Sequence, residues 1–509
     1  MLPLSKYPLW LRSLIAFLGG ASLTLSFAPY GLWIFGLVSL TLLASALTSS
    51  NPRASFLIAW SYGIGSYLTG ASWVYVSIHV YGYAPLPLAA ALTLLFCIAM
   101  GLFIALPFGL YSRYFAMTGQ QFLLGFSATW LLTEWLRGWL FTGFPWLFVG
   151  HAHTDSLLSP LLPVIGSAGI SAVMAFTAAL LSTFTSGTRP QQSQQTAKRA
   201  APVIVIVLIW STGPLLKNHS WVDIPDAPPL KVGAIQANIP QEEKWNPANL
   251  HQTLQSYTAL SEPLWDQHDL IVWPEAAIPG FYHNFQPFIN ALNSKASVNN
   301  SALLTGIPFH TEAGLSHNSV VLLNGTGNGS EQIYFKQRLV PFGEYVPLQN
   351  LLNGLLTLFE LPLSDFRPGP SQQDNLHIGD WQIAPAICYE ITYDQLIAQS
   401  ALNANAIITV SNDAWFGDSI GPKQHMQIAR IRALENAKPI IRSTGSGITG
   451  LIDHKGRVTE QVPSFSREVL SGELVMTEGA TPFAKMKGIP VVVFIVIGLV
   501  FSYRKSKAK

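Results

Sequence analysis

The chain has little charge and almost no cysteine. Only 11% of its 509 residues are Asp, Glu, Lys or Arg, whereas soluble domains carry roughly 25%. The two cysteines, Cys97 and Cys388, lie far apart, so the sequence contains neither a disulfide framework nor a Cys-X-X-Cys motif. No H-E-X-X-H motif occurs, and no basic stripe accompanies the net charge of +2. These absences argue against a metal site and against a nucleic-acid partner.

Charge is scarcest in the first 200 residues. Two long stretches, 13–52 and 54–112, contain no charged side chain at all. Because a membrane-spanning helix needs about 20 apolar residues, each stretch has room for two helices. Between about Lys217 and Lys487 charge is as frequent as in a soluble protein, and the apolar segment IPVVVFIVIGLVFSY follows. The composition therefore predicts a water-soluble region flanked by membrane-embedded regions.

Turn signals divide the apolar stretches into about eight predicted spans. The sequences APYG at 28–31 and HVYGYAPLP at 79–87 separate the first four. The expected spans are 11–28, 31–48, 56–77, 88–111, 121–143, 164–185, 200–216 and 486–503. A re-entrant or interfacial piece at 145–163 would change the count by one. We thus expect a membrane bundle at 1–217, a soluble domain at 218–485, and a C-terminal transmembrane helix with a basic tail at 486–509.

Lysine and arginine lie beside alternate loops. They occur before the first span, after the second, fourth and sixth spans, and after the last one, while the intervening loops have none. Since cytoplasmic loops are enriched in these residues, both termini are expected in the cytoplasm and 218–485 outside it, which is the periplasm in a bacterium. The first 28 residues also resemble a signal peptide, but a second span follows at once, which disfavours cleavage.

One predicted span contains two charges of opposite sign. Glu134 and Arg137 are three positions apart within 121–143 and so lie on the same helix face. Charges at membrane depth are costly and are usually paired or functional. We favour an internal ion pair that holds the bundle together, with binding of a lipid headgroup as the alternative.

The soluble region alternates short β-branched segments with helical ones. KVGAIQANI, DLIVWPEAAIPG, ALLTGIPF, NSVVLLN, WQIAPAICYE and NAIITVSNDAWFG are typical of strands followed by loops. NLHQTLQSYTALSEPLWDQ and PKQHMQIARIRALENAK have helical spacing. This mixture predicts helices layered on a sheet.

Three titratable residues follow apolar, strand-like segments. Glu275 comes after LIVWP, Lys336 after IYF and Cys388 after IAPAI. A carboxylate can deprotonate a thiol, and an ammonium group can stabilise first a thiolate and then an oxyanion. A helix beginning in YEITYDQLIAQ would lower the pKa of the thiol and bring the Tyr389 backbone N–H near the reacting oxygen. A lone cysteine after an apolar run is, however, more often a small buried hydrophobe, and the pattern alone leaves both interpretations open.

The segments around these residues resemble a known family. WPEAAIP, FKQRLVPFGEYVP and CYE are similar to the Glu–Lys–Cys segments of the nitrilase superfamily, and together with the membrane plan the whole chain resembles the apolipoprotein N-acyltransferase family. The resemblance implies an αββα sandwich for the soluble domain. It also implies that Cys388 is the nucleophile, Glu275 the general base and later acid, and Lys336 the stabiliser of the oxyanion.

The resemblance extends to supporting residues. It implies that Glu344 supports the Lys336 and Cys388 arrangement, and that Tyr389 and Glu390 shape the site beside the thiol. It places Trp245 and Trp415 on loops near the acyl or lipoprotein binding region, although half-buried packing would explain both tryptophans equally well.

The family implies a reaction as well. An acyl chain would pass from a membrane glycerophospholipid, phosphatidylethanolamine by resemblance, through a cysteine thioester to the α-amino group of an S-diacylglyceryl cysteine on an apolipoprotein, in contact with bilayer lipids and without a metal or other cofactor. Two alternatives remain. A membrane-tethered amidase would use the same three residues with water as the acceptor, but would not need the bundle. A transporter or receptor with a degenerate external domain would not need the three residues, and no internal repeat is evident.

Overall fold

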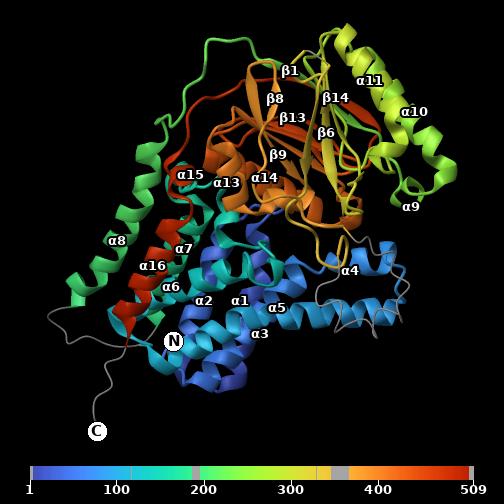
Figure 1. Ribbon diagram of the computed structural model, residues 1–509. Helices are drawn as coiled ribbons and strands as arrows, with labels where there is room; N and C mark the ends of the chain where they lie inside the picture. The colour runs from blue at the N-terminus through green and yellow to red at the C-terminus, as the bar shows by residue number, and fades with distance from the viewer. Residues whose placement is uncertain (1–3, 116, 186–194, 328, 346–365, 504–509) are drawn as a thin grey trace. The chain divides into compact units, whose positions relative to one another are not determined.

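The chain forms two compact units. The computed structural model describes residues 4–115, 117–185, 195–327, 329–345 and 366–503 (Figure 1). One unit comprises Met1–Tyr75, Pro85–His219 and Gly488–Lys509, and the other comprises Val76–Ala84 and Ser220–Lys487. The sequence division placed residues 76–84 in the membrane bundle, whereas in the structure they pack with the second unit.

The first unit is helical. Its long helices are α1 (Leu9–Leu23), α2 (Ile34–Leu47), α3 (Pro52–Gly70), α5 (Leu86–Tyr114), α6 (Gly119–Arg137), α7 (Leu162–Thr185), α8 (Gln195–Leu216) and α16 (Ile489–Ser502). Each predicted span overlaps one of them. Among the residues that the structure describes, three helical segments, Leu9–Ser26, Leu86–Tyr114 and Ser159–Phe184, are long and apolar enough to cross a membrane, and α2, α16 and Pro202–Leu216 are shorter apolar helices. Membrane helices are thus indicated, and the number of spans remains a prediction.

Glycines let α1, α3 and α5 approach one another closely. A Cβ atom on Gly20 would lie 2.0 Å from the carbonyl oxygen of Tyr62, and one on Gly63 would lie 2.6 Å from the Cα atom of Gly101. No larger residue fits at these points without moving a helix. Small residues at helix contacts are the usual way in which apolar helices pack where water supplies no driving force.

The two charged residues of α6 both contact the chain that follows this helix. Glu134 Oε1 accepts hydrogen bonds from the Val149 backbone N–H at 2.8 Å and from Trp130 Nε1 at 3.0 Å. Arg137 donates to the Leu147 carbonyl at 3.3 Å and to the Tyr67 hydroxyl. Through these contacts the two side chains hold residues 147–149 against α6. That segment continues into the short 3₁₀ turns η5 (Val149–His153) and η6 (Ser159–Leu161), within the stretch expected to be re-entrant or interfacial.

The second unit contains two six-stranded sheets. The first has the order β14-β1-β2-β3-β6-β7 and the second β13-β12-β11-β10-β9-β8, with a small β4-β5 ribbon besides. The strands of the first sheet are β14 (Glu468–Leu474), β1 (Leu230–Gln236), β2 (Leu270–Val272), β3 (Ala302–Gly306), β6 (Ser319–Leu323) and β7 (Glu331–Phe335). Those of the second are β13 (Val458–Val462), β12 (Thr449–Ile452), β11 (Ile440–Thr444), β10 (Ala406–Ser411), β9 (Trp381–Ile387) and β8 (Leu376–Ile378). The ribbon pairs β4 (Phe309–His310) with β5 (Ser316–His317). Strands β1, β2 and β3 are mutually parallel, as are β9, β10 and β11.

The two sheets and the helices outside them form four layers, because alternate side chains of each strand face opposite sides of its sheet. Leu270 and Val272 of β2 face the core between the sheets together with Ile408 of β10, while Ile271 faces outward with Trp273. The outer face of the first sheet packs against α10 (Leu250–Ser261) and α11 (Gln286–Val298), and that of the second against α13 (Asp394–Ala401) and α14 (Gly421–Asn436) (Figure 1). Because both faces of each sheet are covered, the strands are almost continuously apolar. The predicted αββα sandwich is confirmed.

Candidate active site

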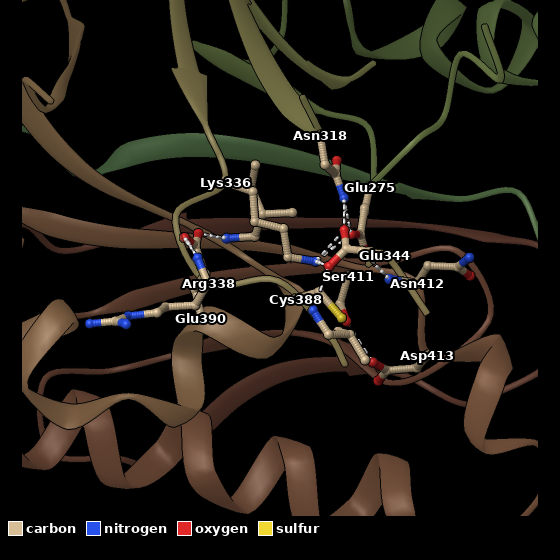
Figure 2. A network of polar contacts seen from close by, with 12 residues as sticks. Glu275, Asn318, Lys336, Arg338, Glu344, Cys388, Glu390, Ser411, Asn412 and Asp413 are labelled. Carbon is tan, nitrogen blue, oxygen red and sulfur yellow. Dashed lines mark hydrogen bonds and ion pairs between the residues drawn. The ribbon is translucent and has the colours of Figure 1, made fainter. Parts of the chain in front are cut away.

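The three titratable residues stand at the ends of strands. Lys336 is the first residue after β7, Cys388 the first after β9, and Glu275 lies three positions beyond β2. Figure 2 shows their side chains converging on one point, with the Cys388 sulfur next to the ends of Lys336 and Glu275. The structure therefore brings together the three residues that the sequence singled out.

Lys336 lies between two carboxylates. Its Nζ atom is 3.1 Å from Glu275 Oε1 and 2.9 Å from Glu344 Oε2. The amide of Asn318 bridges the same two carboxylates, donating to Glu275 Oε1 and Glu344 Oε1 at 2.7 Å each (Figure 2). Lys336 is only 1% exposed, so water screens these interactions little. The cluster fixes the ammonium group in a defined position beside Cys388.

Charge interactions decide the protonation of this cluster. Burial opposes ionisation of Glu275, but Lys336, Asn318 and Lys244 together outweigh it and hold the pKa of this carboxyl below its usual value. Burial likewise opposes the charged form of Lys336, yet Glu275 and Glu344 raise the pKa of its ammonium group above the ordinary one. Glu275 therefore rests as a carboxylate, which is the form a general base needs.

Cys388 has an unusual backbone and an unusual thiol. Its φ angle is 53°, in the left-handed region that few residues with a side chain adopt, and such strain is concentrated at functional sites. The residue is partly exposed, yet the surrounding protein raises the pKa of the thiol well above its ordinary value, chiefly by desolvation and further by Glu275, while Lys336 acts in the opposite direction. The expectation of a thiol pKa lowered by a following helix is wrong. Only a five-residue 3₁₀ turn, η11 (Cys388–Thr392), begins there.

Glu390 holds the turn that carries the thiol. Its carboxylate accepts from the backbone N–H of Ile387 at 2.7 Å and of Gln337 at 2.6 Å, and from the Tyr334 hydroxyl at 3.1 Å. Burial raises the pKa of Glu390 to about 7, although the backbone donors oppose this effect. Glu390 therefore joins the turn after β9 to the loop after β7, which fixes the position of Cys388 relative to Lys336. Its neighbour Tyr389 is buried, and its ring packs 5.3 Å from that of Tyr393.

A second buried network contacts the backbone carbonyl of Cys388. His425 Nε2 lies 3.2 Å from the Cys388 carbonyl oxygen, and His425 Nδ1 lies 3.0 Å from Asp413 Oδ1. Arg442 donates to Asp413 Oδ2 at 2.5 Å. Sequence reasoning missed these residues. Asp413 does carry a signal, since it follows β10 much as Cys388 follows the parallel neighbour β9, but the partners on α14 and β11 come from distant parts of the chain.

The two predicted tryptophans lie in different surroundings. Trp245 directly follows α9 (Gln241–Lys244) and is 48% exposed. Trp415 is partly buried, with its ring 5.7 Å from that of Tyr81 and its carbonyl accepting from the Ser77 hydroxyl at 2.7 Å. The exposed Trp245 is thus available to a ligand. Trp415 is held by the segment Val76–Ala84.

The site offers acid–base and nucleophilic groups but no evident cation ligand set. Among the residues that the structure describes, no group of three or more His, Cys, Asp or Glu side chains is arranged to hold a metal ion. The available chemistry is that of a thiol with an adjacent carboxylate base and an ammonium group able to stabilise a negatively charged oxygen.

Two protein-family models match this chain, and each match lies mainly in one of the two units. Residues 19–180 match the family model for the apolipoprotein N-acyltransferase N-terminal domain, and residues 231–481 match that for carbon-nitrogen hydrolase. Apolipoprotein N-acyltransferase from Azotobacter vinelandii is 41% identical over 508 residues, covering 99% of this chain and 96% of the relative. The protein of the same name from Pseudomonas syringae pv. tomato is 41% identical over 491 residues, covering 96% and 95%. A carbon-nitrogen hydrolase structure from Helicobacter pylori has 17% identity and a TM-score of 0.37, covering 48% of this chain and 89% of that one.

The αββα sandwich with a cysteine, a glutamate and a lysine at its strand ends defines a carbon–nitrogen hydrolase domain, here joined to a bundle of apolar helices. Identity of about 40% along nearly the whole length makes the assignment more specific. The chain belongs to the apolipoprotein N-acyltransferase family.

Proposed function

We propose that this protein is an acyltransferase that moves an acyl chain from a membrane phospholipid to the N-terminal amine of a lipoprotein. The observation that carries the proposal is the Lys336 ammonium group held between Glu275 and Glu344 beside the Cys388 thiol. Membership of the apolipoprotein N-acyltransferase family supports the choice of lipid donor and lipoprotein acceptor.

In the first half-reaction the Cys388 sulfur attacks the ester carbonyl of the phospholipid. Glu275 takes the thiol proton as the C–S bond forms, and Lys336 stabilises the negative charge on the carbonyl oxygen. The C–O bond to the glycerol then breaks, and protonated Glu275 returns the proton to the departing lysophospholipid. A thioester remains on Cys388. Burial raises the pKa of the resting thiol, so the sulfur depends on Glu275 to take its proton.

In the second half-reaction the α-amino group of an S-diacylglyceryl cysteine attacks the thioester. The C–N bond forms, Glu275 accepts a proton from the amine, and the C–S bond breaks to release the thiolate, which then recovers the proton. Amines attack thioesters readily, so the intermediate suits transfer to an amine provided that the site keeps water away. Glu344 and Glu390 keep Lys336 and the cysteine turn in place during both steps. Trp245 and Trp415 are proposed to line the approach of the lipid substrates.

The donor is proposed to be phosphatidylethanolamine, in accordance with the family resemblance. Incubation of the purified protein with phosphatidylethanolamine and a diacylated lipopeptide should yield a lipopeptide with one additional acyl chain and one lysophospholipid per turnover. The alternative function, a membrane-tethered amidase, predicts free fatty acid instead, because water would be the acceptor. Release of fatty acid with no acylated lipopeptide would refute the transferase and support the amidase. An equal rate with phosphatidylglycerol would refute the headgroup preference alone.

The protein is further proposed to lie in the bacterial inner membrane with both termini in the cytoplasm and the α/β unit in the periplasm. The alternation of basic loops supports this orientation. In a Cys97→Ala/Cys388→Ala background, Glu312→Cys should react with a membrane-impermeant maleimide added to right-side-out vesicles. Arg53→Cys, at a position that is also exposed on the protein, should react only after the vesicles are opened. The reverse pattern would overturn the orientation.

A further inference from the structure

A second lysine lies beside the proposed catalytic residues. Lys244 ends the short helix α9 and is 5% exposed, although the residues on either side of it, Glu243 and Trp245, are exposed. Its Nζ atom donates to the backbone carbonyl oxygen of Glu275 at 3.0 Å. A buried ammonium group is costly unless charges or dipoles compensate it, so its position calls for an explanation beyond packing.

The helix turn that carries Lys244 contacts Glu275 directly through Lys244 and indirectly through Gln241. Gln241, one turn earlier on the same inward face, accepts from the Asn412 side-chain amide at 2.9 Å. The backbone N–H of Asn412 donates in turn to Glu275 Oε2 at 2.7 Å. Lys244 thus holds the main chain of Glu275, while Gln241 supports the donor that holds its carboxylate. The next residue, Ala276, has a φ angle of 47°, so this turn is strained in the same way as that of Cys388.

We propose that Lys244 is a positioning residue of the acyl-transfer site, whose ammonium group holds the Glu275 main chain and supplies the positive charge that balances the thiolate and the oxyanion. This inference rests on the proposed function, because it concerns the same site.

Counting charges shows why a second ammonium group is needed. At rest, the site contains the carboxylates of Glu275 and Glu344 and two ammonium groups, that of Lys336 between the carboxylates and that of Lys244 against the Glu275 main chain. When the thiol proton moves to Glu275, the negative charge moves to Cys388 and the sum is again zero. Without Lys244 each of these states would have one uncompensated negative charge in a poorly hydrated site, which burial penalises heavily. Of the other carboxyl groups nearby, Asp413 is already paired with Arg442 and His425. Glu390, whose pKa burial raises to about 7, is held by backbone N–H groups instead.

The electrostatics of Lys244 agree with this role. Burial lowers the pKa of its ammonium group to about 8, and negative charge on Glu275 and on Cys388 opposes that decrease. The same attraction favours the negatively charged forms of Glu275 and Cys388. The other groups that act on the Cys388 thiol from the surrounding elements are Glu275, Lys336, Asp413 and Ser411. Lys336, Asp413 and Ser411 keep their own contacts when Lys244 alone is replaced, whereas Glu275 loses the hydrogen bond and the positive charge of Lys244.

Lys438 provides a matched control in the same unit. It is a fully buried lysine whose Nζ atom donates to the carbonyl oxygens of Thr477 and Gly479, and burial lowers its pKa to about 8 as well. The charged group acting on it is Glu478, not the candidate active site. Replacing Lys438 should therefore reproduce the loss of a buried lysine without altering the thiol.

The test measures alkylation of Cys388 by iodoacetamide in the full-length Cys97→Ala protein across pH of about 6 to 10. Below the thiol pKa the rate is proportional to the thiolate fraction, so Lys244→Met, by raising that pKa by about 1, should slow alkylation about tenfold below pH of about 8, where Lys244 is charged, and by less above it, where Lys244 is neutral in the parent. Lys438→Met should leave the rate unchanged. Lys244→Gln retains a donor for the Glu275 carbonyl but no charge, and should slow alkylation to a similar extent, whereas Lys244→Arg should restore part of the rate.

Acyl transfer is measured on the same proteins. For Lys244→Met we expect kcat to fall about tenfold or more with KM for phospholipid nearly constant. If folded Lys244→Met and Lys244→Gln proteins alkylate as fast as the parent, the inference is wrong, whatever the transfer assay shows. If the parent protein transfers no acyl chain, the proposed function fails, while the alkylation result still decides the role of Lys244.

Discussion

Cys388→Ala is expected to abolish both the acyl-enzyme and lipopeptide acylation, and Cys388→Ser is expected to lower kcat on the order of 10⁴-fold or more. Alanine provides no nucleophile. Serine provides an alcohol that is far less acidic than a thiol, so Glu275, held as a carboxylate by Lys336, is too weak a base to activate it. Mass spectrometry of the parent protein incubated with phospholipid alone should show one acyl chain on the peptide containing Cys388.

The folded state should survive these changes. Both replacements retain a Cβ atom, so the left-handed φ angle of 53° at this position costs about as much in the variants as in the parent. Cys97→Ala is the matched control, because Cys97 is the other free thiol and lies on α5 in the helical unit. It should retain the acyl adduct and full transfer. Substantial transfer by Cys388→Ser, or an adduct on Cys97, would exclude Cys388 as the nucleophile.

Lys336→Met is expected to lower both stability and activity severely. Methionine fills similar space but leaves the carboxylates of Glu275 and Glu344 without the cation that lies between them, and breaking a buried ion pair in this way costs about 3–5 kcal/mol. Loss of the group that stabilises the oxyanion should reduce kcat by about 10²-fold or more. Thermal unfolding in detergent and single-turnover formation of the acyl-enzyme measure the two effects.

A second substitution separates charge pairing from catalysis. In the Lys336→Met background, Glu344→Gln removes one of the two unpaired carboxylates, so part of the thermal stability should return while transfer does not. Binding of phospholipid, measured separately, should change much less than turnover. Recovery of transfer in the double variant, or equal losses of binding and turnover in Lys336→Met, would contradict a role for Lys336 in stabilising the oxyanion.

Strand ends explain why so much of the site could be predicted. Apolar runs bounded by polar residues define buried strands, and a titratable residue directly after such a run lies where a rigid sheet presents its loops. Glu275, Lys336 and Cys388 all satisfy this rule, and Asp413, two positions after β10, nearly satisfies it. The rule identifies candidates but does not show which strand ends meet, because that depends on the order of strands in two separate sheets.

The prediction from the local sequence was wrong for the segment after Cys388, where contacts with distant residues decide the backbone and the thiol pKa. YEITYDQLIAQ has the composition of a helix start, yet Glu390 turns back to bind the Ile387 and Gln337 N–H groups, and the chain makes a 3₁₀ turn before α13 begins at Asp394. Desolvation and the neighbouring Glu275 then raise the pKa of the thiol, the opposite of what a helix terminus would do. Neither effect is visible in the residues adjacent to Cys388.

The sequence by itself determined the apolar helices, the layered α/β domain, the family and three residues at strand ends, because hydrophobic periodicity and short motifs are local properties of the chain. Only the tertiary structure decided that Asn318 bridges Glu275 and Glu344, that His425 lies against the Cys388 carbonyl, and that Lys244 donates to the Glu275 carbonyl. These residues come from segments tens to more than a hundred positions apart. Their protonation and roles depend on burial and on neighbouring charges, which exist only once the two sheets have packed together.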